Sequence, residues 1–206
     1  MRAPARLLAL ALALPLLAAA VDPSDQRRDL ERIESWFNDL RSMRARFVQF
    51  APDGGQASGD LLFERPDKMR LDYDPPSPVL IIANGWELIY VDRKLGQTSH
   101  ILTSSTPLGF LLEDQIRFSG DVTVDDFTRV DGQIRVTVSQ TDEPGEGSIT
   151  LFFDDEPLAL QRWAVTDAQG LTTHVVLEDV ELDVAIDGAM FRYREPRRRF
   201  GVGRDD

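Results

Sequence analysis

Apolar and polar positions follow a helical rhythm near the start of this chain. Between residues 24 and 43 the apolar side chains recur at steps of three and four, the spacing of one face of an α-helix. These positions are Leu30, Ile33, Trp36, Phe37, Leu40 and Met43. The preceding segment Asp22 to Asp25 (DPSD) predicts a helix start with Ser24 or Asp25 as the N-cap. We therefore predict one amphipathic helix, the only long one indicated by the sequence.

Most of the remaining chain alternates with period two, which is typical of half-buried β-strands. Met69, Leu71 and Tyr73, for example, alternate with the polar residues between them. Asn84-Gly85 predicts a tight hairpin, because both residue types accept a positive φ. The other runs cover Phe47 to Gln49, Leu61 to Phe63, Val79 to Ile82, Leu88 to Val91, Val136 to Val138, Ile149 to Phe153, Leu158 to Val165 and Leu171 to Leu177.

Regular short strands joined by turns predict one large antiparallel sheet, a sandwich or a barrel. One face of this sheet must be covered, and the N-terminal helix is the first candidate. The second is Thr106 to Leu112 (TPLGFLL), where a Thr cap, Pro107 at the first helical position and an apolar cluster predict a short helix near 106–113.

The chain begins with the pattern of a secretory signal peptide. An apolar run, Leu7 to Ala20, follows Arg2 and Arg6 and is too short to span a bilayer. Ala18 and Ala20 fit the A-x-A cleavage rule, so we expect a signal peptide over 1–20 and a single domain over 21–206. There is no cysteine. We therefore expect an exported soluble protein that is neither a lipoprotein nor held by disulfides.

The charge of the chain argues against some partners. The net charge is -12, and an acidic domain is repelled by phosphate backbones and anionic lipid surfaces. We therefore expect no nucleic-acid partner and no stable residence on a membrane. A basic cluster, Arg197 to Arg199, follows Pro196 near the end. It indicates either a solvated tail or a contact to an acidic partner or a lipid headgroup.

Little in the sequence predicts catalysis. The two histidines, His100 and His174, are far apart, and His174 falls opposite the apolar positions of its strand, which predicts solvent exposure. Known nucleophile, zinc-protease and phosphate-loop motifs are absent from the sequence. Three Asp-Asp pairs, at 125–126, 154–155 and 205–206, could serve a hydrolase, but they fall in turn-like or terminal segments and are better read as solvated. We expect that the protein is not an enzyme and that it binds no metal and no cofactor.

An ordered set of short motifs resembles a known family. Arg44 to Gln49 (RARFVQ) precedes Gly59 to Pro66 (GDLLFERP), and Lys68 to Tyr73 follows. Next come Ile81 to Gly85 (IIANG), Gln97 and the Thr106 to Leu112 segment. Together these resemble the periplasmic lipoprotein carriers named LolA, over about residues 24–195. The fold-sharing receptor of that family is itself a lipoprotein, so the missing cysteine favours the carrier.

The resemblance implies a mainly β fold in which an incomplete antiparallel β-barrel of about eleven strands covers a hydrophobic cavity beneath a helical lid. It implies that Arg65, before Pro66, latches the lid by hydrogen bonds to backbone carbonyls of the 106–112 segment. The implied lipid-cavity residues are Trp36, Phe37, Phe47, Leu61, Phe63, Met69, Leu71, Ile81, Phe110 and Leu112.

The resemblance also implies a function. The expected protein is a monomeric periplasmic chaperone that binds the acyl chains of lipoproteins released from the inner membrane by an ABC transporter. It would carry them to an outer-membrane receptor, if one is present, or to the membrane itself. An exported lipid-binding protein with another ligand, and less strongly a β-fold hydrolase, remain the alternatives.

Overall fold

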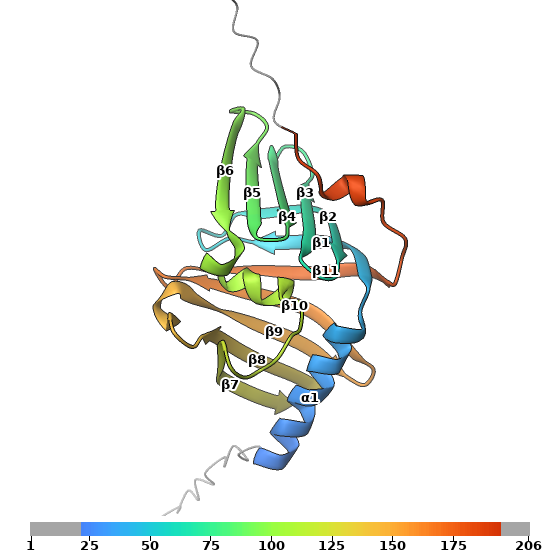
Figure 1. The fold of residues 1–206 in the computed structure, drawn as a ribbon, viewed down its shortest axis with the longest axis vertical. Coiled ribbons are helices and arrows are strands. Elements are labelled where there is room, and N and C mark those ends of the chain that lie inside the picture. Colours follow the sequence, from blue (N-terminus) through green and yellow to red (C-terminus); the bar gives the residue numbers. More distant parts are fainter. Residues whose placement is uncertain (1–21, 195–206) are drawn as a thin grey trace, which may run out of the picture.

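The structure, a computed structural model, describes residues 22–194. Eleven strands form one antiparallel sheet in the order β6-β5-β4-β3-β2-β1-β11-β10-β9-β8-β7. The strands are β1 Ser42–Phe50, β2 Gln56–Glu64, β3 Lys68–Tyr73, β4 Val79–Asn84, β5 Glu87–Asp92, β6 Gln97–Leu102, β7 Val122–Val130, β8 Gln133–Gln140, β9 Gly147–Asp155, β10 Leu158–Asp167 and β11 Thr172–Leu182. The sheet is open, with β6 and β7 at its edges, and it curves like part of a barrel (Figure 1). The expected mainly β, incomplete-barrel fold is confirmed. The expected signal peptide and the 197–199 cluster lie outside the described residues.

Helix α1, Pro23–Asp39, is the predicted amphipathic helix. Its N-cap is Asp22, whose carboxylate accepts a hydrogen bond from the Ser24 N–H at 2.8 Å. The prediction of Ser24 or Asp25 as the cap was wrong, because Pro23 has no N–H to be satisfied and suits the first helical position. Ile33 and Phe37 are buried, and Phe37 meets Phe153 of β9 edge-to-face, with ring centroids 5.8 Å apart. The apolar stripe therefore packs on the sheet as its spacing predicts.

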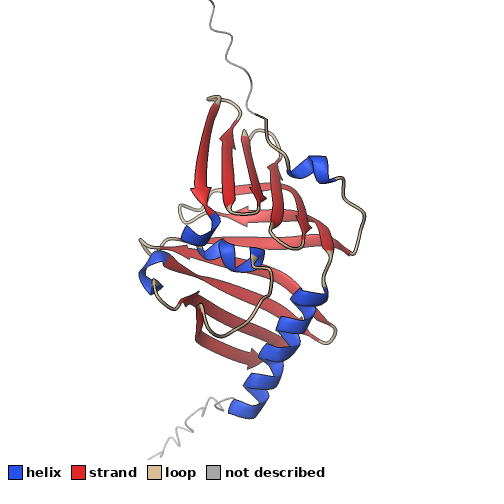
Figure 2. Ribbon diagram, in the orientation of Figure 1, coloured by secondary structure: helices blue, strands red, loops and turns tan. Residues whose placement is uncertain are grey.

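The predicted helix near 106–113 is present as a 3-10 helix, η2, at Pro107–Leu112, preceded by the 3-10 turn η1 at Thr103–Ser105. Thr106 lies at the cap position, but its hydroxyl donates to the Thr103 carbonyl oxygen at 3.1 Å instead of capping η2. Figure 2 shows α1 and the η1–η2 segment on the same side of the sheet. Side chains from both belong to one apolar core together with strands from both halves of the sheet.

The strand alternation agrees with the sequence pattern where one face is buried. Met69, Leu71 and Tyr73 of β3 are buried on the side of α1 and η2. Gly85, with a φ of +108°, makes the turn between β4 and β5. The edge strands β6 and β7 were not among the predicted runs. Both are largely exposed, so their sequences lack the apolar alternation of a covered strand.

The C-terminal part of the described chain covers the other face of the sheet. Two neighbouring residues of β3 point to opposite faces, so Arg70 lies opposite Leu71. An Arg70 Nη1–H donates to the Met190 carbonyl oxygen at 3.0 Å, which places the 3-10 turn η4, Gly188–Phe191, on that second face. Tyr193 packs there against a small apolar cluster of Leu80, Ile82, Ile89 and Val91.

Two smaller expectations were wrong. His174 is half-buried, and its Nδ1 atom is buried without a hydrogen-bond partner among the described residues. Asp155 ends strand β9 and is buried, whereas Asp125-Asp126 lies within β7 with both residues exposed. These acids are therefore strand residues rather than turn residues, and Asp125 and Asp126 are solvated as expected. Within residues 22–194, no helix has the length and apolar character needed to cross a bilayer.

Candidate functional site

The ten residues expected to line a lipid cavity come together in one place. All belong to, or pack against, the single apolar core that joins α1, η2 and the sheet. Trp36 and Ile81 are partly buried, and the other eight are buried: Phe37, Phe47, Leu61, Phe63, Met69, Leu71, Phe110 and Leu112. The space beneath η2 is thus filled by side chains, those of η2 included.

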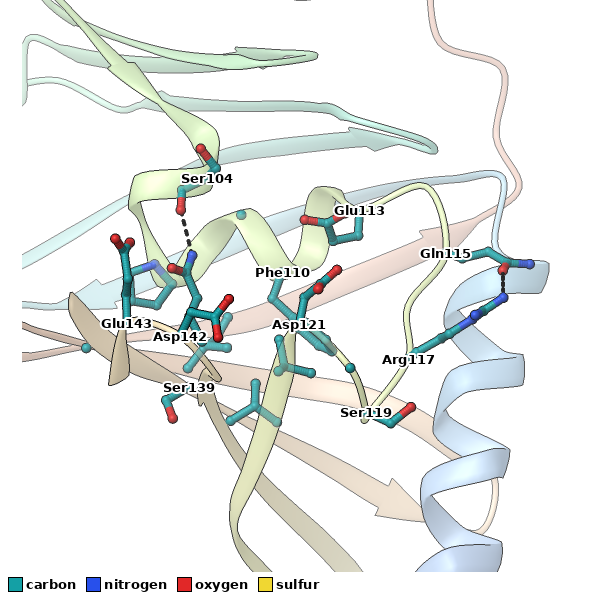
Figure 3. A pocket seen from close by; sticks show the side chains of 18 residues that line it. Ser104, Phe110, Glu113, Gln115, Arg117, Ser119, Asp121, Ser139, Asp142 and Glu143 are labelled. Carbon is teal, nitrogen blue, oxygen red and sulfur yellow. Dashed lines mark hydrogen bonds between the residues drawn. The ribbon is translucent and has the colours of Figure 1, made fainter. Parts of the chain in front are cut away.

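A cavity of about 860 Å³ lies beside η2 (Figure 3). Its apolar lining comprises Pro107, Phe110, Val122, Val138 and Ile149, and its polar lining includes Ser104, Glu113, Gln115, Arg117, Ser119, Asp121, Ser139, Gln140, Asp142 and Glu143. Phe110 is the one expected cavity residue that borders it. Ligand pockets typically measure roughly 300 to 1,000 Å³, and the volume of this cavity lies within that range.

Arg65 lies at the end of β2, and its guanidinium reaches over to η2. One Nη1–H donates to the Leu111 carbonyl oxygen at 3.2 Å, and Nη2 donates to the Asp114 carbonyl oxygen at 3.0 Å. Burial lowers the pKa of Arg65, against which the carboxylates of Asp114 and Glu113 act in the opposite direction. The exposed Pro66 follows in the turn to β3. Leu111 belongs to the 106–112 segment that the resemblance names, whereas Asp114 lies two residues beyond it.

The segment after η2 is attached to α1. The carboxamide of Asn38 donates from Nδ2 to the Ile116 carbonyl oxygen at 3.0 Å and accepts from the Ile116 N–H at 2.9 Å. Glu34, one turn earlier, accepts from the Phe118 N–H at 2.7 Å. Sequence reasoning missed both residues. Their spacing of four places them on one face of the helix, but a polar helix face is ordinarily solvated, so the sequence offered no signal of a partner.

A group of two buried carboxylates and two partly exposed arginines, which we call the α1 ion cluster, attaches the helix to the sheet. It consists of Asp29, Arg32, Arg129 and Asp155. The Asp29 side chain is 0% exposed and accepts from Arg32 at 2.9 Å and from Arg129 at 2.7 Å. Asp155 accepts from the same two arginines. Since each acid faces both arginines, α1 is joined to β7 and β9 through a closed ring of charge-assisted hydrogen bonds.

The described residues hold no group of three or more His, Cys, Asp or Glu side chains placed to bind a metal ion. Near η2, Arg65 donates to the Leu111 and Asp114 carbonyl oxygens, and Arg117 donates to the carboxamide oxygen of Gln115. The arrangement therefore consists of an apolar interior beneath the short apolar segment η2. Arg65 links this segment to the end of β2.

The chain is similar in sequence to a known family of proteins. The family model described as outer membrane lipoprotein carrier protein LolA matches residues 38–194. An outer-membrane lipoprotein carrier protein of Halorhodospira halophila is 29% identical, over 95% of this chain and 93% of its own. One of Alkalilimnicola ehrlichii is 30% identical, over 92% of this chain and 89% of its own. A solved LolA superfamily protein of Nitrosomonas europaea has 11% identity and a TM-score of 0.46, covering 80% of this chain and 97% of its own.

Proposed function

Since the chain belongs to the LolA family of outer-membrane lipoprotein carrier proteins, we propose that it carries lipoproteins across the periplasm by enclosing their acyl chains. It would receive them from a lipoprotein-releasing ABC transporter of the inner membrane. It would deliver them, as a monomer and without catalysing a reaction, to an outer-membrane receptor or to the membrane itself.

The observation that carries the proposal is the burial of η2. Phe110, Leu111 and Leu112 are 7%, 2% and 4% exposed, and they fill the space under the curved sheet together with strand residues. We infer that η2 occupies the position that the acyl chains would take when cargo is bound. Displacing η2 would join that space to the adjoining 860 Å³ cavity and give room for more than one chain.

The energetics suit a carrier that must release its cargo. Burial of each methylene is worth about 0.8 kcal/mol, so a long acyl chain gains roughly 10 kcal/mol on leaving water. Exposing each large side chain of η2 costs about 1.5–3 kcal/mol. Because cargo entry requires this exposure, the net gain is smaller than the burial of the chains alone. A receptor with a preformed site can then accept the cargo without an energy source.

Arg65 would act as the latch of the closed arrangement, because its contacts to Leu111 and Asp114 must break when η2 moves. The test is transfer of a purified lipoprotein from the Arg65→Leu variant to receptor-containing vesicles. We expect the cargo to bind but to transfer at least tenfold more slowly. Arg44→Leu, on the exposed side of the neighbouring strand β1, is the matched control. Transfer by R65L at the rate of the unmodified protein would remove the latch.

The cargo itself can be identified independently. Mass spectrometry of the protein purified from its native periplasm should find bound acylated protein. Bound phospholipid or glycolipid alone would favour a lipid-binding protein with a different ligand. Recovery with no lipid of any kind would contradict the carrier proposal.

A further inference from the structure

The carboxamide of Asn38, in the last turn of α1, makes a two-point contact with the chain after η2. It donates to the Ile116 carbonyl oxygen and accepts from the Ile116 N–H, at 3.0 and 2.9 Å. A carboxamide presents a donor and an acceptor side by side, so it can pair with a backbone residue in this way. Ile116 is 0% exposed. The contact therefore fixes a buried position on the chain that leaves η2.

The same Asn38 oxygen faces the latch. Its Oδ1 lies 3.4 Å from Nη2 of Arg65, the nitrogen that also donates to the Asp114 carbonyl oxygen. The guanidinium therefore meets oxygen atoms from three places: η2 (Leu111), the following turn (Asp114) and α1 (Asn38). Because a guanidinium is planar and rigid, all three oxygens must be held in place for these bonds to form together.

Asn38 belongs to a part of the molecule that is itself attached to the sheet. The α1 ion cluster joins the helix to β7 and β9, and Glu34 adds a second contact to the segment after η2 through the Phe118 N–H. The helix therefore offers a fixed support for the chain around residue 116.

The chain before η2 is fixed as well. The Thr103 N–H donates to the Trp86 carbonyl oxygen at 2.9 Å, and the Thr103 hydroxyl donates to the Gly85 carbonyl oxygen at 3.2 Å. The Gln140 carboxamide also donates to the Ser104 carbonyl oxygen of η1 at 2.6 Å. Among the described residues, Arg65 is the side chain that donates to the backbone of η2 itself. The apolar segment η2 therefore lies between two stretches that are held by hydrogen bonds, and its own backbone is held by Arg65.

We propose that Asn38 is the positioning residue of this latch: it holds the chain at Ile116 and thereby sets the Asp114 and Leu111 oxygens where Arg65 can bind both. The proposal rests on the lid role proposed for η2 and extends it to a residue on a different element. It implies that Asn38 acts through Arg65, so that the effects of the two side chains on η2 are coupled and not independent.

The experiment is native-state hydrogen exchange of the ligand-free protein, followed at the amides of residues 110–113, for N38A, R65L and the double variant. We expect at least tenfold faster exchange in each single variant. The double variant should exchange no more than about threefold faster than the faster single variant, because Asn38 acts through Arg65 and either single substitution already disables the same latch. Asp39→Ala, at the exposed neighbouring position, is the matched control and should stay within twofold of the unmodified protein.

Two results would overturn the proposal. One is exchange in N38A within twofold of the unmodified protein. The other is a double variant whose acceleration is the product of the two single effects, which is what independent structural roles would give. Thermal unfolding of each variant checks the fold, and if N38A does not fold, Asn38→Gln, which moves the same carboxamide by one methylene, is measured against the same outcomes.

A separate measurement isolates the proposed function. Binding of a triacylated peptide is followed with the same proteins, and we expect N38A to take it up faster than the unmodified protein. If the unmodified protein binds no triacylated peptide, the carrier function fails, while the exchange result still decides whether Asn38 positions Arg65.

Discussion

Replacing Asp29 with asparagine tests whether the α1 ion cluster attaches the helix to the sheet. The Asp29 side chain is 0% exposed and accepts one hydrogen bond from each of Arg32 and Arg129. Asparagine keeps the shape but removes the charge, and it turns an N–H group toward at least one arginine. Removing one partner of a buried ion pair typically costs about 3–5 kcal/mol.

The expected cost here is smaller. The side chains of Arg32 and Arg129 are 36% and 32% exposed, and Asp155 stays in contact with both. Water and the remaining carboxylate therefore compensate part of the loss, and we expect D29N to lower the free energy of unfolding by about 2 kcal/mol. For a chain of this size that corresponds to a fall in melting temperature of roughly 4–8 °C.

The structure provides a matched control on the same helix. Asp25 pairs with Arg28 at the same three-residue spacing, but the two side chains are 48% and 62% exposed. Asp25→Asn should therefore cost less than about 1 kcal/mol, including its interaction with the helix N-terminus. Thermal unfolding monitored by circular dichroism measures both variants. Equal melting temperatures for D29N and D25N would refute the assignment of the buried cluster as the attachment of α1.

Two further predictions concern the pH dependence of stability and the close packing of η2 against Thr103. Burial raises the pKa of Asp155, but its two arginine partners lower it by more, so its pKa in the folded protein lies below the ordinary value of 3.8. The stabilisation that Asp155 contributes is present above that ordinary value and is lost as the pH falls through the folded pKa, so Asp155→Asn should weaken the dependence of melting temperature on pH below about pH 4. A Cβ on Gly109 would lie 2.4 Å from the Thr103 carbonyl oxygen, so Gly109→Ala should speed hydrogen exchange in η2 at least tenfold. Gly145→Ala is the control, because a Cβ there would meet nothing within 4 Å, and it should leave the exchange unchanged. Equal exchange in the two variants would show that η2 does not depend on the close approach of Gly109 to Thr103.

The elements could be predicted from the sequence wherever one face is covered. The three- and four-residue spacing of α1 and the strict alternation of β3 both result from burial of a single side, and burial selects apolar residues at that period. The edge strands β6 and β7 were not predicted, because neither has a fully covered face that would select apolar residues at every second position. The cap of α1 was misplaced by two or three residues, since Asp22 and Ser24 are both good capping residues and only the position of Pro23 in the fold separates them.

The residues of the candidate site also fall into those that could be predicted from the sequence and those that could not. The apolar residues under η2 could be named from the sequence, and so could Arg65, through an ordered set of motifs. The contacts of Asn38 and Glu34 with the chain after η2, and the sharing of two arginines by Asp29 and Asp155, became visible only in the folded arrangement. The physical reason is that hydrophobic burial repeats along the chain with the period of each element, whereas a polar contact joins residues that may be 78 or 100 positions apart and leaves no periodic trace in either segment.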